Sequence, residues 1–121
     1  MRSILFKAKK LSDGKWVKGS LVKTPFGTFI EWYEDSICNK REVDTDTVCQ
    51  FTGLKDCEGN ELYEHDVIKN YPFLPSEIVW SEELSGYYLT HANGKIYEKP
   101  LGYYLSLGKF IVVGNKFDKE K

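Results

Sequence analysis

The sequence is short of the residues on which cross-linked and metal-bound proteins depend. Its 121 residues include three cysteines and two histidines. Cys38, Cys49 and Cys57 are odd in number and form no close pair, so we expect reduced thiols rather than a disulfide framework. A structural zinc site needs about four ligands arranged in close pairs. Because the sequence has no such pairs, we expect no metal and no other cofactor.

Long apolar runs are also absent. No stretch of about 18 apolar residues occurs, and Lys7 interrupts the N-terminal apolar segment before a signal-peptide core is reached. We therefore expect a soluble cytoplasmic protein. A chain of this length that is 41% hydrophobic can build one packed core, so we expect a single domain over residues 1–121.

Charge is balanced overall but unevenly distributed. The net charge is -1, yet residues 1–23 contain seven lysines and arginines against one aspartate. This asymmetry is consistent with a basic binding face, with head-to-tail association of unlike patches, or with an ordinary solvated surface.

Short apolar or β-branched segments recur between turn signals every 8–12 residues, and no segment has sustained helical periodicity. This pattern predicts an all-β fold, a small barrel or sandwich of short antiparallel strands with at most one or two helical turns. We expect strands within 4–9 and 15–22, then at 28–33, 47–51, from 67, and at 77–80, 87–90, 103–107 and 110–113. Strand 77–80 should form a hairpin with 87–90, and 103–107 should pair with 110–113 around Gly108. A short helix at 101–107 is the alternative to the strand there. Residues 34–46 read as an exposed connection, 61–64 as at most one helical turn, and 110–113 as a strand covered on both faces.

The first two strands form a hairpin whose register can be derived. A four-residue loop at 11–14 pairs Lys9 with Trp16, Ala8 with Val17 and Lys7 with Lys18. One face then collects the apolar residues Ile4, Phe6, Ala8, Val17 and Leu21. The opposite face holds Lys7, Lys9, Trp16 and Lys18.

This second face has two interpretations. Its lysines could neutralise phosphates while the indole of Trp16 stacks on an unpaired base. Alternatively, the lysines are solvated and their stems cover a packed indole. The second interpretation is favoured by a pI of about 6.1, well below that of a dedicated nucleic-acid binder.

Catalytic constellations are missing. The nearest candidate is Glu64-His65-Asp66, but strand alternation would place His65 opposite its two neighbours, so the three should not converge. No phosphate-binding loop or nucleophile motif occurs. We expect no enzyme, unless a pocket brings several of Asp56, Glu61, Glu64 and Asp66 together.

Aromatic residues are plentiful, at 15% of the chain. Most of them fill the core and brace the strands of a small β domain. In the adjacent pairs Trp32-Tyr33 and Tyr87-Tyr88, however, one ring of each must face away from the other. An exposed ring would mark an interface, for example between copies of the chain.

Residues 50–68 read QFTGLKDCEGNELYEHDVI and closely resemble the signature of the YopX family of phage and prophage proteins, approximately QyTGLkDknGkeIyEGDiV. Two further segments agree with the family. On the N-terminal side, FKAKK at 6–10 and DGKWVKGSL at 13–21 together resemble the family pattern FRAK…GeWvyGdL. On the C-terminal side, VGNKFD at 113–118 resembles viGNiyE. The resemblance gives a structural role to the residues that carry it: Thr52, Gly53, Leu54, Lys55, Asp56, Gly59, Glu61, Tyr63, Glu64, Asp66, Gly114 and Asn115.

Individual positions of the motif have physical reasons. Gly53 would end a strand in a turn that needs a permissive backbone, and Asp66 would cap the return into the next strand. His65 stands where the family usually has glycine, so it is strained if that glycine serves a positive φ. Cys57 stands where a polar residue is usual.

The resemblance implies a β-rich fold with a small barrel-like part, in the cytoplasm of a bacterial host. It implies no reaction, substrate or cofactor, because the family largely lacks an assigned activity. We therefore expect a phage or prophage accessory protein that binds an unidentified protein partner or assembles with itself. Binding of nucleic acid by the Lys7, Lys9, Trp16 and Lys18 face is the alternative.

Overall fold

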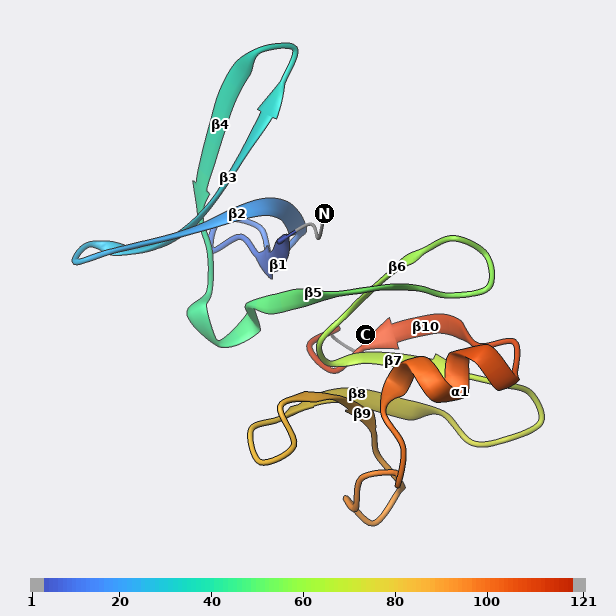
Figure 1. Ribbon diagram of the computed structural model, residues 1–121. Helices are drawn as coiled ribbons and strands as arrows, with labels where there is room; N and C mark the ends of the chain where they lie inside the picture. Colours follow the sequence, from blue (N-terminus) through green and yellow to red (C-terminus); the bar gives the residue numbers. More distant parts are fainter. Residues whose placement is uncertain (1–3, 119–121) are drawn as a thin grey trace. The chain divides into compact units, whose positions relative to one another are not determined.

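The computed structural model describes residues 4–118 and is shown in Figure 1. The chain divides into two compact units, Met1–Phe51 (unit 1) and Thr52–Lys121 (unit 2). Whether both belong to one domain, as predicted from the length, stays a prediction.

Unit 1 is an antiparallel sheet with strand order β4-β3-β2-β1-β5 (Figure 1). Its elements are β1 (Phe6–Lys9), β2 (Trp16–Thr24), β3 (Gly27–Glu34), β4 (Ile37–Glu42), the 3-10 turn η1 (Thr45–Thr47) and the first part of β5 (Cys49–Lys55). The strands predicted near 28–33 and 47–51 are therefore confirmed as β3 and β5.

The predicted register of the first hairpin is confirmed. Lys9 lies opposite Trp16, Ala8 opposite Val17 and Lys7 opposite Lys18. The apolar face of the hairpin contributes to the core of unit 1, which consists of Ala8, Ile30 and Val43 with Phe6, Val17, Leu21, Trp32 and Val48 packed against them. Ile4 was expected in this core but is exposed. It precedes β1, so strand alternation does not fix the direction of its side chain.

The prediction of an exposed connection over residues 34–46 was wrong, because this segment contains β4. Asp35 and Ser36 form a two-residue turn with positive φ at both positions, 51° and 67°. Such a turn matches the twist of the two strands that it joins, here β3 and β4. The segment is polar because β4 lies at the edge of the sheet and is mostly exposed.

Unit 2 contains the second part of β5 with β6 (Glu61–Tyr63) beside it, and a four-stranded sheet of order β10-β7-β8-β9. The further elements are β7 (Asp66–Lys69), β8 (Ser76–Ser81), β9 (Gly86–Leu89), the helix α1 (Leu101–Leu107) and β10 (Ile111–Asn115). The predicted hairpin of 77–80 with 87–90 is confirmed as β8 and β9. The helical turn allowed for 61–64 is instead strand β6.

The pairing of 103–107 with 110–113 was also wrong. Residues 101–107 adopt the alternative, helix α1, because Leu101, Tyr104 and Leu105 share one face of a helix and contact the core. This core consists of Leu62, Ile68, Ile78, Leu89 and Leu101. Strand β10 pairs with β7, and its register shifts between Val112 and Gly114. The intervening Val113 is exposed, so β10 is not covered on both faces.

The mainly β prediction is confirmed, with one helix and one 3-10 turn in the described part of the chain. Neither sheet closes into a barrel over residues 4–118. Within the same residues, no helix has the length and apolar character needed to cross a membrane.

Gly19 gives a test of the packing in unit 1. A Cβ at this position would lie 2.3 Å from the backbone oxygen of Glu31 on the neighbouring strand. We expect Gly19→Ala to lower the free energy of unfolding by about 1–3 kcal/mol, the usual cost of overpacking. Chemical denaturation followed by circular dichroism measures this change.

The matched control is Gly102→Ala in helix α1, where the added carbon would make an ordinary 3.8 Å contact with Leu54. Alanine is the better helix former, so the control should be neutral or more stable by about 0.5–1 kcal/mol. A Gly19→Ala protein as stable as the wild type would show that the close approach of β2 and β3 is not a constraint.

Candidate functional site

The first part of the family-like motif joins β5 to β6. The hydroxyl of Thr52 donates a hydrogen bond to the backbone oxygen of Leu62 (2.8 Å) and accepts one from the backbone N–H of Leu54 (3.1 Å). Gly53 has a φ of +86°, which confirms that this position needs a permissive backbone. The strand does not end there, however, since β5 continues to Lys55, whose side chain is exposed like that of Leu54.

Asp56 organises the loop that follows β5. Its carboxylate accepts hydrogen bonds from the backbone N–H groups of Glu58 (2.9 Å), Asn60 (2.8 Å) and Val112 (3.1 Å), and from the Asn60 amide (3.1 Å). Burial acts to raise the pKa of Asp56, but these hydrogen bonds outweigh it and hold the pKa below its usual value. Gly59 completes the turn with a φ of +86°.

Asp66 and Asn115 form a buried connection between β7 and β10. One carboxylate oxygen of Asp66 accepts a hydrogen bond from the backbone N–H of Tyr63 (2.8 Å), and the other accepts one from the Asn115 amide (2.9 Å). The Asn115 oxygen accepts a further hydrogen bond from the backbone N–H of Phe117 (2.9 Å). The two ends of the motif, far apart in sequence, thus meet in unit 2, where Gly114 lies directly before Asn115.

Tyr63 and Glu61 also have structural partners. The Tyr63 hydroxyl donates a hydrogen bond to the Glu61 carboxylate (2.9 Å). Burial, and then the adjacent carboxylate, raise the pKa of Tyr63. This tyrosine therefore stays protonated over the physiological range.

His65 has a φ of +71°, so the position does take the left-handed conformation for which glycine is suited. Its Nδ1 atom lies 2.8 Å from the Glu77 carboxylate, and its Nε2 atom lies 3.8 Å from that of Glu64. Glu64 therefore does not lie on the side opposite His65, as strand alternation predicted. The three side chains still do not converge, because the Asp66 carboxylate is bound to Asn115 and to the backbone of Tyr63. Glu77 was missed because only the pairing of β7 with β8 brings it close.

These groups do not assemble a metal site. Over residues 4–118, no cluster of three or more His, Cys, Asp or Glu side chains could hold a metal ion. No disulfide links the cysteines there: Cys38 and Cys57 are exposed, and the buried Cys49 thiol donates to the backbone oxygen of Thr47.

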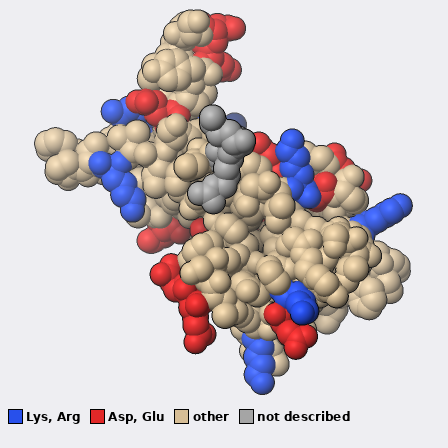
Figure 2. Space-filling model, in the orientation of Figure 1, with Lys and Arg blue, Asp and Glu red and all other residues tan. Residues whose placement is uncertain are grey.

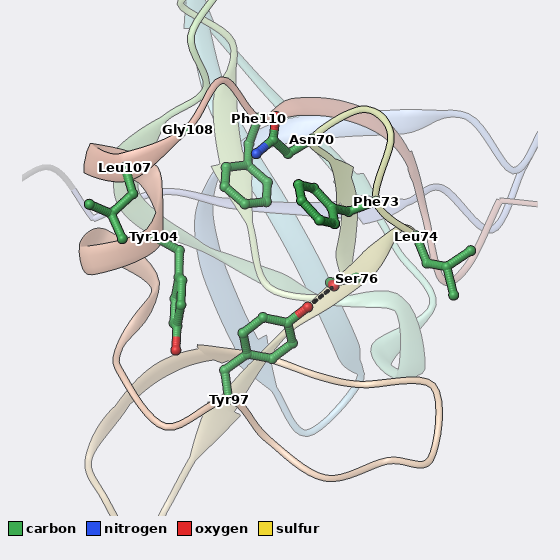
Figure 3. Close-up of a pocket in the computed structure, with 9 residues that line it drawn as sticks. All are labelled: Asn70, Phe73, Leu74, Ser76, Tyr97, Tyr104, Leu107, Gly108 and Phe110. Atoms are coloured by element: carbon green, nitrogen blue, oxygen red, sulfur yellow. Dashed lines mark hydrogen bonds between the residues drawn. The ribbon is translucent and has the colours of Figure 1, made fainter.

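A pocket of about 240 Å³ opens in unit 2 (Figure 3). It lies among the segments that follow β7, begin β8, form α1 and precede β10. Its lining residues are Asn70, Phe73, Leu74, Ser76, Tyr97, Tyr104, Leu107, Gly108 and Phe110. This set is called the pocket below, and none of its residues is among the site residues predicted from the sequence.

The pocket combines aromatic walls with few polar groups. The hydroxyls of Tyr97 and Ser76 lie 3.1 Å apart and hydrogen-bond each other (Figure 3). The Asn70 amide lies beside the Phe110 ring (Figure 3). It makes no side-chain hydrogen bond to any other residue of the described chain. An open amide among aromatic rings is the kind of polar group that orients a bound molecule.

Three lining residues are exposed and form what we call the rim: Phe73 (66% exposed), Leu74 (77%) and Leu107 (67%). Tyr71, beside Asn70 in sequence, is 83% exposed. Large apolar side chains gathered at a pocket mouth mark an interaction site rather than ordinary surface. The one sequence signal for this site was the apolar pair Phe73-Leu74, which lies between Pro72 and Pro75 in a segment that otherwise reads as an exposed link.

The motif residues support the pocket. The backbone N–H of Cys57 donates to the backbone oxygen of Phe110 (3.1 Å), and Asp56 holds Val112 two residues further on. The bond from Asp66 to Asn115 joins β7, which leads to Asn70, with β10, which follows Phe110. The motif therefore positions two walls of the pocket without lining it.

The face proposed for nucleic acid lies in unit 1. The structure brings Lys7, Lys9, Trp16 and Lys18 together, as the register predicted. The amino groups of Lys7 and Lys9 lie 4.7 Å and 5.4 Å from the centre of the half-buried Trp16 ring. Two lysine amino groups therefore lie over the indole ring in the geometry of a cation–π interaction.

The aromatic pairs behave differently from each other. Tyr33 is exposed while Trp32 packs against the core of unit 1, as expected for opposite faces. Tyr88 is buried, and Tyr87 packs against the core of unit 2 and against Trp80 (ring centres 5.0 Å apart). Only the first pair therefore exposes a ring.

Comparison with known proteins adds a family and a fold. A family model described as "YopX protein" matches residues 5–120. The structure titled "Crystal structure of protein EF1440 from Enterococcus faecalis" is similar, with a TM-score of 0.57 and 17% sequence identity over 95% of this chain and 94% of that one. At this identity the likeness concerns the fold alone. No curated protein matches the chain.

Asp56 gives a pH-dependent test of the motif. We expect Asp56→Asn to lower the free energy of unfolding by about 1–3 kcal/mol at neutral pH, because buried N–H groups lose a charged acceptor. The pKa of Asp56 is lower in the folded than in the unfolded chain. Its stabilising effect is therefore full above the unfolded pKa of about 4 and is lost as the pH falls through the folded value.

Urea denaturation of both proteins at neutral pH and near pH 3 measures this difference, which should shrink in acid. Glu58→Gln is the matched control, because it removes an exposed carboxylate from the same loop and keeps the four hydrogen bonds to Asp56. An equal difference at both pH values would contradict the role of the Asp56 charge.

Proposed function

The chain belongs to the YopX family, and from that premise we propose that it is a non-enzymatic phage or prophage accessory protein of the bacterial cytoplasm that acts by binding protein. The pocket and rim of unit 2 form the binding surface. The observation that carries this proposal is the exposure of Phe73, Leu74 and Leu107 around one aromatic hollow.

Exposed apolar side chains around a pocket can contribute strongly to a protein interface. Burying them against a partner removes their apolar area from water, which contributes about 25 cal/mol per Å². In protein interfaces, an anchor seated in a central pocket and a surrounding ring that excludes water supply most of the affinity. The partner is either another protein or a further copy of this chain.

The proposal that the protein is not an enzyme rests on how its polar groups are used. The Asp56 and Asp66 carboxylates each accept several hydrogen bonds, and Glu61 is bound to Tyr63. These motif carboxylates do not line the pocket. The lining residues of the pocket offer an amide and three hydroxyls but no carboxylate or imidazole. The ring of His91 stacks on the Tyr97 ring, with centres 4.1 Å apart, and is not itself a lining residue.

The alternative function, nucleic-acid binding by unit 1, draws on Trp16 and the three lysines beside it. Two of them already cover its ring. On the face in view in Figure 2, Lys and Arg side chains are scattered rather than gathered in one continuous patch. Protein binding is therefore the better supported of the two.

Light scattering and affinity capture with matched variants test the leading proposal. Leu107→Glu places a charge on the rim and should abolish retention of partners that bind the wild type. If the partner is a second copy, it should also reduce a mass above 14.0 kDa toward that of the monomer. The control is Tyr33→Glu, which charges an exposed aromatic position of unit 1 and should change nothing. Identical behaviour of the wild type and Leu107→Glu would refute the proposed surface.

Tryptophan fluorescence titrated with single-stranded and duplex oligonucleotides tests the alternative. If unit 1 binds nucleic acid, quenching should weaken as salt rises and disappear in Trp16→Ala. Because the amino groups of Lys7 and Lys9 already lie over the Trp16 ring, we expect oligonucleotides to cause no salt-dependent quenching of the wild-type fluorescence at physiological ionic strength. A response that Trp16→Ala removes would place the basic face first.

A further inference from the structure

We propose that two copies of the chain pair through the edge strand β4, antiparallel and two-fold symmetric, with Asn39 of one copy opposite Asn39 of the other. The strand lies at the edge of the sheet of unit 1 (Figure 1), so the inference goes beyond the function proposed for the pocket of unit 2. Two features carry it: the open backbone groups of β4, and the order of charged and neutral side chains along the strand.

The turn before β4 fixes which of its residues turn their backbone groups away from β3. The two-residue turn is closed by Glu34 and Ile37, so this pair is hydrogen-bonded. Hydrogen-bonded residues then alternate along the strand, and the backbone N–H of Val43 accordingly donates to Thr28 of β3 (2.9 Å). The residues of β4 whose backbone groups point outward are Cys38, Lys40 and Glu42.

Two of these three residues are open to a further strand. The backbone oxygen of Glu42 already accepts a hydrogen bond from the N–H of Leu11 (3.1 Å). The N–H and oxygen of Cys38 and the N–H of Lys40 have no hydrogen-bond partner within residues 4–118. The oxygen of Lys40 accepts only from the exposed side chain of Arg41 (2.9 Å), which a neighbouring strand can replace.

The edge strands of unit 2 differ from β4 because groups of the same chain occupy them. Along β10, the Asp56 carboxylate accepts a hydrogen bond from the backbone N–H of Val112 (3.1 Å). Along β9, the backbone N–H of Tyr97 donates to the oxygen of Leu89 (2.8 Å). A row of unpaired backbone groups at a sheet edge is a template for pairing with another chain, and β4 offers such a row.

One symmetric register uses both open residues of both strands. It places Cys38 of one copy opposite Lys40 of the other, and each such pair exchanges two backbone hydrogen bonds. A register centred on Cys38 would set Lys40 against Ser36, which lies in the turn with a φ of +67°. A register centred on Lys40 would set Cys38 against Glu42, whose oxygen is already bonded.

The charges on β4 favour the same register. The facing pairs are Cys38 with Lys40, Asn39 with Asn39, and Ile37 with Arg41. No like charges lie directly opposite each other in this arrangement, whereas a register centred on Lys40 would oppose two ammonium groups, which is destabilising. Charged residues usually protect an edge strand from pairing, but here they exclude the other registers. The strand is therefore complementary to a second copy of itself.

The pairing also covers the exposed apolar residue of the strand. Ile37 is 65% exposed in the single chain, and the aliphatic stem of Arg41 from the second copy would lie against it. Glu34 is the neighbour of Ile37 on β3. Opposite charges, the Arg41 guanidinium and the Glu34 carboxylate, thus share one row across the joined sheets.

Engineered disulfides test the register. In a Cys38→Ser, Cys57→Ser background, Asn39→Cys should cross-link two copies on mild oxidation, because directly opposite residues have Cα atoms about 4.5–5.5 Å apart, within the range of a disulfide. The matched control is Ile37→Cys on the same face of β4. Its two copies would lie about 14 Å apart, since they are four residues out of register at about 3.4 Å each, so it should not cross-link. Electrophoresis without reductant measures both.

A proline substitution tests the hydrogen bonds of the edge. Lys40→Pro removes an N–H that points outward and leaves the pairing with β3 intact. We expect the mass of the wild type to rise with concentration toward twice 14.0 kDa, and the dissociation constant of Lys40→Pro to be at least about tenfold higher, or about 1.4 kcal/mol. Lys40→Ala loses the same charge but keeps the N–H, so it should associate like the wild type. Sedimentation equilibrium measures the masses, and circular dichroism shows whether each variant is folded.

The outcomes separate this inference from the proposed function. Leu107→Glu should leave the Asn39→Cys cross-link unchanged, because Leu107 belongs to unit 2. A cross-link that Leu107→Glu abolishes would assign self-association to the pocket and overturn the pairing through β4. Equal cross-linking of Asn39→Cys and Ile37→Cys, or equal association of Lys40→Pro and the wild type, would overturn it while leaving the pocket untouched. A wild type that is monomeric at every concentration would refute the second copy.

Discussion

The buried hydrogen bond between Asp66 and Asn115 is the constraint on which unit 2 depends. It joins β7 to β10, while the other oxygen of the same carboxylate fixes the backbone at Tyr63. A charged side chain is costly to bury unless its lone pairs are filled, so the aspartate and the asparagine require each other. The Asp56 carboxylate likewise joins two segments, because it accepts hydrogen bonds both from its own loop and from the backbone N–H of Val112 in β10. Two carboxylates thereby fix the strands whose ends form the pocket.

This use of the carboxylates separates the family motif from the surface that we propose for binding. The motif is the most recognisable part of the sequence, yet its two aspartates accept backbone and amide hydrogen bonds, and none of its acids lines the pocket. The surface available for binding comes from less distinctive residues, such as Phe73, Leu74 and Leu107.

The parts of the structure that depend only on residues close in sequence were predicted correctly. The register of the first hairpin follows from alternation and loop length, and the structure has the predicted pairs. The left-handed backbone at Gly53 was foreseeable because glycine in a turn favours it, and that at His65 because the family signature has glycine at this position. Elements whose identity depends on distant partners were misjudged. Strand β4 is polar because it is an edge, and Leu101 to Leu107 form a helix because one helical face contacts the core of unit 2.

The sequence by itself determined the mainly β class, the first hairpin, the family and the absence of a recognisable catalytic motif, because these depend on composition and on residues close in the chain. Tertiary structure alone decided that Asp66 meets Asn115, that Glu77 reaches His65, and that β10 pairs with β7 rather than with residues 103–107. It also decided the pocket, whose walls come from residues 70–76, Tyr97 and residues 104–110 of unit 2. Such a site has no local sequence pattern, because the side chains that form it become neighbours only when the strands pair.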